Sequence, residues 1–407
     1  MKKNIINYTL IWGAVIMLIS CGGKKETNQA QEETAPPSEE KWSVRLADSD
    51  ISRLEDWIVG DPYWGYHEGL VCKAMLDMWQ YTGDDKYFEF VKGFGDNIIE
   101  EDGTIKTYKM EIYNIDNINS GKVLIPLYQE TGEEKFRKAL DTLMQQLEKH
   151  PRVSDGGFWH KKKYPHQVWL DGLYMAGPFL AAYGATFDQS AQVDDAAAQL
   201  IAAYEVLFDP EKHLLYHGWD ESREQDWADK ETGLSSNFWS RGMGWFVMAI
   251  VDVLDYMPQD HPDRAKLIEM ANSIAVGIKD HQDPKTGAWY QVTDQGDREG
   301  NYLEASGTGM FVYFLYKGVR KGYLPETYLA TANKGYEGLV NQFFKVEADG
   351  TVTVTDVCSV AGLGGDGNRD GSFEYYISEP IKENDPKGTA PAVMASIEHE
   401  RSLAENQ

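Results

Sequence analysis

The chain has 407 residues, 65 of them acidic and 39 basic, and a formal net charge of −26. An excess of negative charge this large repels nucleic-acid phosphates, and the basic cluster in the body, Lys161–Lys163, is too short to form a binding stripe. The three cysteines occur without a CxxC or HExxH pattern, so the sequence predicts no metal site.

The N-terminus has the pattern of an export signal. Lys2 and Lys3 precede an apolar run over 10–19 that is too short for a mature membrane span. The run ends in Leu-Ile-Ser-Cys, which resembles a bacterial lipobox and makes Cys21 the predicted lipidation site. The alternative is an ordinary cleaved signal with an incidental cysteine. We therefore expect a lipoprotein signal peptide over 1–20 and export to a bacterial membrane, with the protein facing the periplasm or the cell surface.

Residues 21–41 are rich in Gly, Gln, Glu, Thr and Pro and have little to bury, which is typical of a flexible tether. The body, 42–407, contains no second linker, so we expect it to be one domain. Its apolar residues recur at helical spacing in paired segments separated by turn signals. Five pairs are predicted at 65–81 with 86–99, 116–129 with 134–149, 168–183 with 191–207, 238–256 with 262–281, and 306–321 with 326–344. A less regular sixth pair is predicted at 373–379 with 388–399.

The first helix of each pair is rich in Gly, Ala, Trp and Tyr, whereas the second is amphipathic. Such a contrast suits a ring in which the inner helices are buried on both sides and the outer helices are wet on one face. The sequence therefore predicts an all-α (α/α)6 toroid of six helical hairpins. A stacked solenoid is the alternative, but the repeat of roughly 50 residues exceeds the ~34 of tetratricopeptide repeats.

Polar residues stand at the starts of three predicted inner helices: Asp116, Asp171 and Arg241. First-turn acids often only stabilise the helix dipole. The apolar neighbours of Asp171 would bury its carboxyl group, and a buried acid is a candidate for catalysis. If the two carboxylates met, their repulsion would keep one of them protonated near neutral pH. Arg241 lies between Trp239 and Trp245, where it could bind a substrate carboxylate or serve as a stacked structural residue.

Several blocks of the body resemble the unsaturated rhamnogalacturonyl hydrolases of glycoside hydrolase family 105. The blocks are 66–70, 168–175, 216–220, 239–245, 358–365 and 379–388. The resemblance implies that Asp171 is the general acid/base and Asp116 its partner carboxylate. It also implies a substrate pocket lined by His160, Lys161, His217, Trp239, Arg241 and Trp245.

This family acts on oligosaccharides that end in a uronic acid with a C4=C5 double bond. The resemblance implies that Asp171 protonates C4, that water adds at C5, and that the resulting hemiketal opens without a metal or organic cofactor. Two alternatives stay open: an inverting glycosidase acting on saturated oligosaccharides, and a lipid-anchored glycan-binding protein. The segment 366–371 matches the start of a calcium loop, but Ile377 stands where a bidentate Glu belongs, which favours a substrate-side loop.

Overall fold

The structure is a computed structural model that describes residues 41–365 and 369–405. The predicted signal peptide, Cys21, nearly all of the tether and residues 366–368 of the candidate calcium loop lie outside the described residues. Residues Glu40–Gln407 form one compact unit. Among the described residues, no helix is long and apolar enough to cross a membrane.

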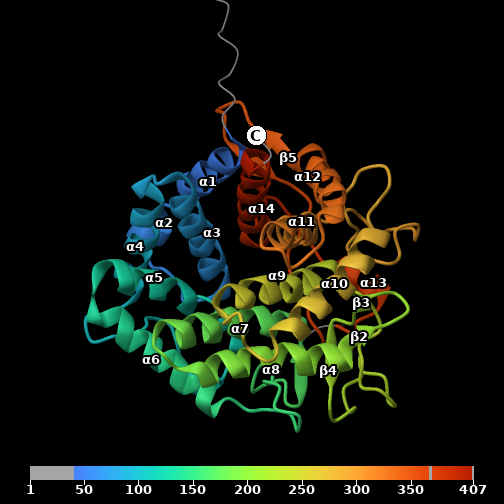
Figure 1. The fold of residues 1–407 in the computed structure, drawn as a ribbon, viewed down its shortest axis with the longest axis horizontal. Helices are drawn as coiled ribbons and strands as arrows, with labels where there is room; N and C mark the ends of the chain where they lie inside the picture. Colours follow the sequence, from blue (N-terminus) through green and yellow to red (C-terminus); the bar gives the residue numbers. More distant parts are fainter. Residues whose placement is uncertain (1–40, 366–368, 406–407) are drawn as a thin grey trace, which may run out of the picture. The chain divides into compact units, whose positions relative to one another are not determined.

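A closed ring of helices forms the inner layer of this unit (Figure 1). Each inner helix contacts the next one, and the last returns to the first. In order, the members are α3 (Tyr66–Thr82), α5 (Gly121–Thr131), α7 (Leu170–Thr186), α9 (Ser240–Tyr256), α11 (Ala305–Arg320) and α14 (Pro386–Glu405). The predicted toroid is therefore confirmed.

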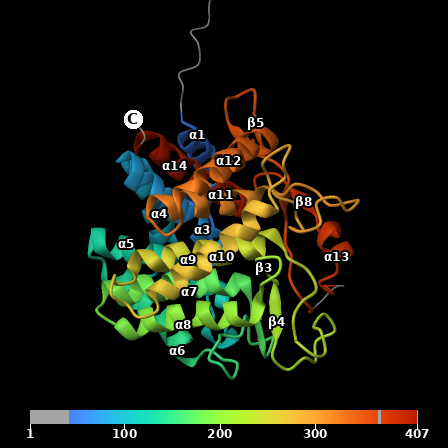
Figure 2. The same ribbon diagram turned by 45° about the vertical axis from the view of Figure 1, so that its right-hand side comes forward.

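Each inner helix is covered by an outer one; in both views α7 lies between α9, its neighbour in the inner ring, and α8, its outer partner (Figure 2). The outer helices are α4 (Asp85–Ile98), α6 (Glu134–Lys149), α8 (Ser190–Leu207), α10 (Arg264–Asp280), α12 (Leu329–Phe343) and α1 (Trp42–Arg53). Every residue of α9 from Ser240 to Leu254 is buried, whereas α6 buries one face. The expected difference between inner and outer helices is thus present.

The predicted sixth hairpin is wrong. Residues 373–379 form only the short helix α13 (Phe373–Ser378), and the outer partner of α14 is α1, from the other end of the body. The hydroxyl group of Ser43 on α1 donates a hydrogen bond of 2.7 Å to Glu400 on α14. The two ends of the body therefore close the ring together, a pairing that no local sequence pattern encodes.

Short antiparallel strand pairs and single turns connect the helices. The pairs are β1 (Gln167–Trp169) with β4 (Gly218–Asp220), β2 (Phe208–Asp209) with β3 (Leu214–Leu215), β5 (Phe344–Val346) with β6 (Val352–Val354), and β7 (Val357–Cys358) with β8 (Ile381–Lys382). The remaining helical turns are α2 (Asp56–Val59), η1 (Met110–Ile112), η2 (Ile115–Ile118) and η3 (Glu326–Tyr328). The β1–β4 pair lies directly before the start of α7. It sets Val168 opposite Trp219 and so fixes the position of the chain that enters this inner helix.

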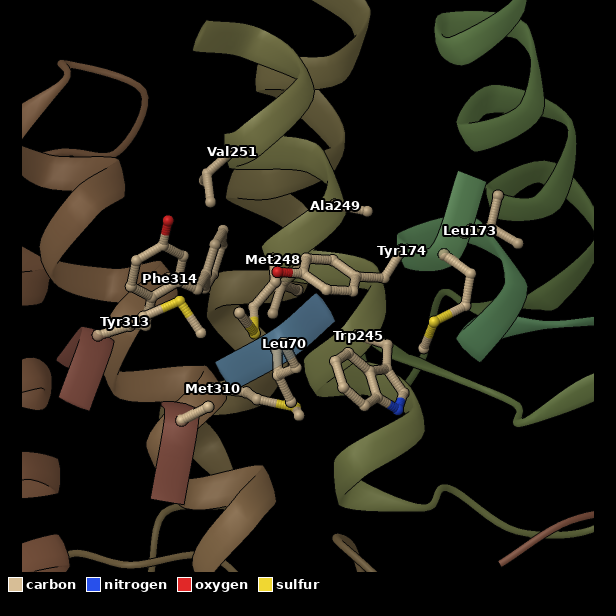
Figure 3. Packing of buried hydrophobic residues seen from close by; sticks show 14 of the residues in the cluster. Leu70, Leu173, Tyr174, Trp245, Met248, Ala249, Val251, Met310, Tyr313 and Phe314 are labelled. Carbon is tan, nitrogen blue, oxygen red and sulfur yellow. The ribbon is translucent and has the colours of Figure 1, made fainter. Parts of the chain in front are cut away.

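The middle of the ring is filled by large apolar side chains from different inner helices (Figure 3). Leu70 of α3, Tyr174 of α7, Trp245 and Met248 of α9, and Met310 of α11 lie close together there. The rings of Tyr174 and Trp245 stack with their centroids 5.0 Å apart. This layer separates the polar groups at the two ends of the ring.

Candidate active site

One end of the toroid gathers polar side chains from the starts of the inner helices. Each inner helix contributes one group at or just before its first turn. The groups are His67 of α3, Asp116 of η2 ahead of α5, Asp171 of α7, Arg241 of α9, Glu304 ahead of α11, and Lys387 of α14. The three polar helix starts singled out from the sequence therefore lie at the same end.

Asp171 belongs to a hydrogen-bonded chain of three side chains. Its Oδ2 lies 3.0 Å from Nε2 of His217, and Nδ1 of His217 lies 2.7 Å from the hydroxyl of Tyr376. The β1–β4 pair positions the first two members, because Asp171 follows β1 and His217 precedes β4. The side chain of Asp171 is 15% exposed, so it is reachable from solvent, whereas His217 is fully buried.

Burial raises the pKa of the Tyr376 phenol well above its usual value, so the phenol keeps its O–H and can donate it to Nδ1 of His217 in the tautomer that carries its proton on Nε2. The Nε2–H of His217 then donates to Oδ2 of Asp171. Oδ1 of Asp171 is left as the oxygen that can carry a transferable proton.

Asp116 forms an ion pair beside this chain. Its Oδ2 lies 2.6 Å from Nζ of Lys161, and its Oδ1 lies 3.7 Å from Nε2 of His160. The bridge between Asn114 and Lys161 places the lysine, and the Asn114 side chain accepts a hydrogen bond from the backbone N–H of Asp116. Burial alone would raise the pKa of Asp116, but Lys161 and then His160 outweigh it, so the pKa is lowered.

His160 contributes little positive charge to this pair. Burial lowers its pKa to about 4, so the ring is neutral near pH 7. The ring stacks on Trp169 with the centroids 4.2 Å apart. Lys161 therefore carries the cation that keeps Asp116 ionised, rather than Asp116 sharing a proton with Asp171. Protonation of Asp171 stays a prediction.

Arg241 is held by protein groups. Its guanidinium donates to the hydroxyl of Ser306 at 3.3 Å and to the carbonyl of Cys358, and it lies 3.9 Å from Glu304. It also lies 4.7 Å from the ring centroid of Trp239. These contacts favour the structural interpretation of Arg241, and its contact with substrate stays a prediction.

The two predicted tryptophans are also buried: Trp239 and Trp245 are each 1% exposed. Trp239 packs against His217, with ring centroids 4.7 Å apart, and its N–H donates to Gln291. Trp245 lies beneath the polar end, between Tyr66 and Tyr174. Both tryptophans are therefore packing residues that lie beneath the polar side chains of the site.

Sequence reasoning missed a second polar cluster at the same end. Lys387 lies 2.6 Å from Asp385 and 3.0 Å from Nε2 of His67. Burial and the neighbouring Arg241 lower the pKa of Lys387 to about 8, and burial together with Lys387 lowers that of His67 to about 4. The blocks 66–70 and 379–388 already carried the family resemblance, so they could have identified His67 and Lys387.

No sequence motif marked Tyr376 as a functional residue; it lies on the short helix α13.

The two lysines that follow Lys161 are exposed, which agrees with their interpretation as a solvated basic patch. In the described ranges 41–365 and 369–405, no group of three or more His, Cys, Asp or Glu side chains could hold a metal ion. Cys72 and Cys358 are both free and buried.

A family model described as Glycosyl Hydrolase Family 88 matches residues 42–403, nearly the whole body. The chain belongs to this family. The solved structure of a C. acetobutylicum glycoside hydrolase from family 105 is 48% identical, with a TM-score of 0.86. That match covers 89% of this chain and 99% of the other. The predicted family and glycosidase class are confirmed.

This family 88 member also has more distant relatives, one matched by sequence and one by structure. An unsaturated rhamnogalacturonyl hydrolase of Bacillus subtilis is 24% identical over 249 residues, which is 60% of this chain and 67% of the relative. The solved unsaturated glucuronyl hydrolase of Bacillus sp. GL1 is 14% identical, with a TM-score of 0.65 over 89% of this chain and 96% of that one. At this identity the likeness concerns the fold alone.

Proposed function

We propose that this family 88 hydrolase removes a terminal 4,5-unsaturated uronic acid from oligosaccharides produced by polysaccharide lyases. The observation that carries the proposal is the partly exposed Asp171, held by the His217–Tyr376 chain beside the ionised Asp116. The names of the B. subtilis and Bacillus sp. GL1 relatives, an unsaturated rhamnogalacturonyl and an unsaturated glucuronyl hydrolase, agree with this substrate class.

The first chemical step is protonation of the enol ether. Oδ1 of Asp171 delivers a proton to C4, and positive charge develops at C5 and on the ring oxygen. The Nε2–H of His217 fixes Oδ2, so the proton-bearing oxygen keeps one orientation toward the sugar. General acid catalysis by a positioned carboxyl group is worth about 10²–10⁴-fold.

The second step is the addition of water at C5. Asp171, now ionised, takes a proton from the attacking water, and the product is a hemiketal. The ionised Asp116 accepts a hydrogen bond from the water or from a sugar hydroxyl and stabilises the positive charge that develops nearby. Opening of the hemiketal breaks the bond between C5 and the ring oxygen, which gives a ketone at C5 and a hemiacetal at C1. The hemiacetal then collapses to an aldehyde, and its hydroxyl proton leaves with the shortened sugar.

The carboxylate of the uronic acid requires a cation in an acidic protein. Lys161 and Lys387 both lie at this end, each already paired with one carboxylate. Their ammonium groups have three donors each, so they can bind a further anion without breaking those pairs. This arrangement favours an anionic sugar over a neutral one.

The test is the Asp171→Asn variant, assayed by the loss of the ultraviolet absorbance of the enol ether. We expect turnover to disappear while substrate binding stays measurable. Lys162→Met, which alters an exposed lysine near the site, is the matched control and should retain activity. Normal turnover by Asp171→Asn would remove Asp171 from the acid role.

The same assay with a saturated oligosaccharide separates the proposal from its two alternatives. Cleavage of the saturated sugar would instead support an inverting glycosidase. Binding of the unsaturated sugar by the wild-type protein without any turnover would support a glycan-binding protein.

The protein's place in the cell is also part of this proposal: export, with a lipid anchor at Cys21. Its support is the basic start, the apolar run over 10–19 and the Leu-Ile-Ser-Cys sequence. Wild-type protein expressed in bacteria should incorporate labelled fatty acid and fractionate with membranes, and Cys21→Ser should lose both properties. A wild-type protein without the label would refute the anchor.

A further inference from the structure

A cavity of about 330 Å³ lies at the end of the toroid opposite Asp116 and Asp171. Apart from Lys122, a long side chain from the first turn of α5, its lining residues come from the later turns of the inner helices or from their ends. Asp252 of α9 is one of them, and at about 1.5 Å per residue it lies roughly 16 Å along the helix from Arg241. The apolar layer of Trp245, Met248 and Met310 lies between the two ends (Figure 3). The cavity is therefore separate from the catalytic end.

The cavity is rich in charged side chains, and basic ones are in excess. The basic residues are Lys73, Lys122, Lys317, Arg320, Lys321 and Arg401, and the acidic ones are Asp77, Asp252, Asp255 and Glu398. The excess is the reverse of the whole chain, in which 65 acidic residues outnumber 39 basic ones. A local excess of cations in a negatively charged protein favours an anionic ligand.

Most of these charges are already paired. Lys317 lies 2.6 Å from Asp252 and 2.7 Å from Asp255, and Lys73 lies 2.6 Å from Asp77. Arg320 and Arg401 both bind Glu398, and Lys321 binds Asp255. These ion pairs hold five of the six basic side chains that line the cavity. The sixth basic side chain has no such partner among the described residues.

Lys122 is that side chain. It is 7% exposed, and its Nζ has no hydrogen-bond partner among the described residues. The ammonium lies 3.6 Å from the centroid of the Tyr174 ring, a cation–π contact that supplies no counter-charge. Burial lowers its pKa well below the usual value, and nearby Asp252 only partly opposes this.

Two other polar atoms at this place are also buried without a partner among the described residues: Oδ2 of Asp252 and the hydroxyl of Tyr174. Oδ1 of Asp252 accepts from Lys317 and from Tyr313, so that oxygen is satisfied. The free Oδ2 is an acceptor that requires a donor such as a hydroxyl group. Buried groups left unpaired in this way are costly, which points to a ligand that pairs them.

We propose that this cavity binds a small hydroxylated carboxylate of the size of a single sugar acid. Its carboxylate pairs with Nζ of Lys122, and one of its hydroxyl groups donates to Oδ2 of Asp252. A volume of about 330 Å³ lies at the lower end of the usual range for small-molecule pockets, ~300–1,000 Å³, which suits one ring or one short chain. The exposed Gln80 and Lys321 at the rim mark the entrance.

The test measures binding of D-glucuronate to the purified body by calorimetry, with D-glucose as the neutral comparison. Lys122→Met keeps most of the side-chain volume and removes the ammonium group. We expect at least about tenfold weaker glucuronate binding in this variant, because a charge-assisted hydrogen bond is lost. Lys138→Met, on the exposed face of α6, is the matched control and should bind as the wild type does.

A crystal structure of the wild-type protein with glucuronate provides a second measurement that does not depend on the variant folding. Density within hydrogen-bond distance of Lys122 and Asp252 is expected. Equal affinity in wild type and Lys122→Met, equal binding of glucose, or density only at the catalytic end would each overturn the proposal. None of these outcomes depends on turnover of the unsaturated substrate, so the proposed function is tested separately.

Discussion

Replacing Tyr376 with phenylalanine removes one buried hydrogen bond behind the catalytic residue. The phenol donates to Nδ1 of His217 at 2.7 Å, and Tyr376 and His217 are both 0% exposed. Water cannot easily replace the lost donor, so Nδ1 is left unpaired at a cost of about 1–3 kcal/mol. The imidazole is then less firmly held in the tautomer that donates to Oδ2 of Asp171.

If this cost falls on the orientation of Asp171 in the transition state, kcat decreases by about fivefold to about 150-fold. KM should change little, because Tyr376 is buried and acts through His217. The assay is the initial rate of absorbance loss at several substrate concentrations, together with thermal unfolding of each variant. This separates an effect on positioning from a general loss of stability.

The matched control is the neighbouring Tyr375→Phe. The Tyr375 hydroxyl accepts a hydrogen bond of 2.9 Å from the backbone N–H of Gly362 and also hydrogen-bonds to Glu379, so this variant loses hydrogen bonds that do not involve His217. It should lower the unfolding temperature at least as much as Tyr376→Phe but keep the wild-type kcat. Wild-type kcat in Tyr376→Phe, or equal losses of kcat in both variants, would refute the role of the His217 chain.

Two further predictions concern the partner carboxylate and the packing of the ring. Lys161→Met removes the cation that lowers the pKa of Asp116, while burial, which raises it, remains. Asp116 then protonates at a higher pH, so the acid limb of the rate profile should move to higher pH. Gly69→Ala should destabilise the fold by about 1–3 kcal/mol, because an added Cβ would lie 2.6 Å from the Cα of Ser120 and the backbone must shift.

Each of these has its own control. Lys162→Met changes an exposed lysine next to Lys161 and should leave the acid limb in place; a shift of equal size in both variants would show a general charge effect. Gly95→Ala places its Cβ 2.7 Å from Cδ1 of Leu127, the end of a flexible side chain, so it should cost much less than Gly69→Ala. Equal stability of the two alanine variants would contradict the close approach of α3 to the chain around Ser120.

The helical hairpins were predictable because their signals are local. The outer helix at 134–149 has the predicted bounds, since one apolar face alternates with charged residues throughout. Glycines end two inner helices in the left-handed conformation, Gly83 at φ +72° and Gly132 at φ +68°, where the turn signals were seen. Asp171 and His217 were found from short sequence blocks that keep their residues together.

The sequence by itself thus determined the repeated inner and outer helices and the family, and it predicted the carboxylates Asp116 and Asp171 as the catalytic pair. Only the tertiary structure decided which helix closes the ring, because α1 and α14 come from opposite ends of the body and share no local pattern. The same holds for Tyr376 behind His217 and for Lys122 at the far cavity, whose ammonium has no hydrogen-bond partner in the part of the chain that the structure describes. Each depends on contacts between residues distant in sequence, and a helical period records which face of a helix is buried but not which side chain it meets.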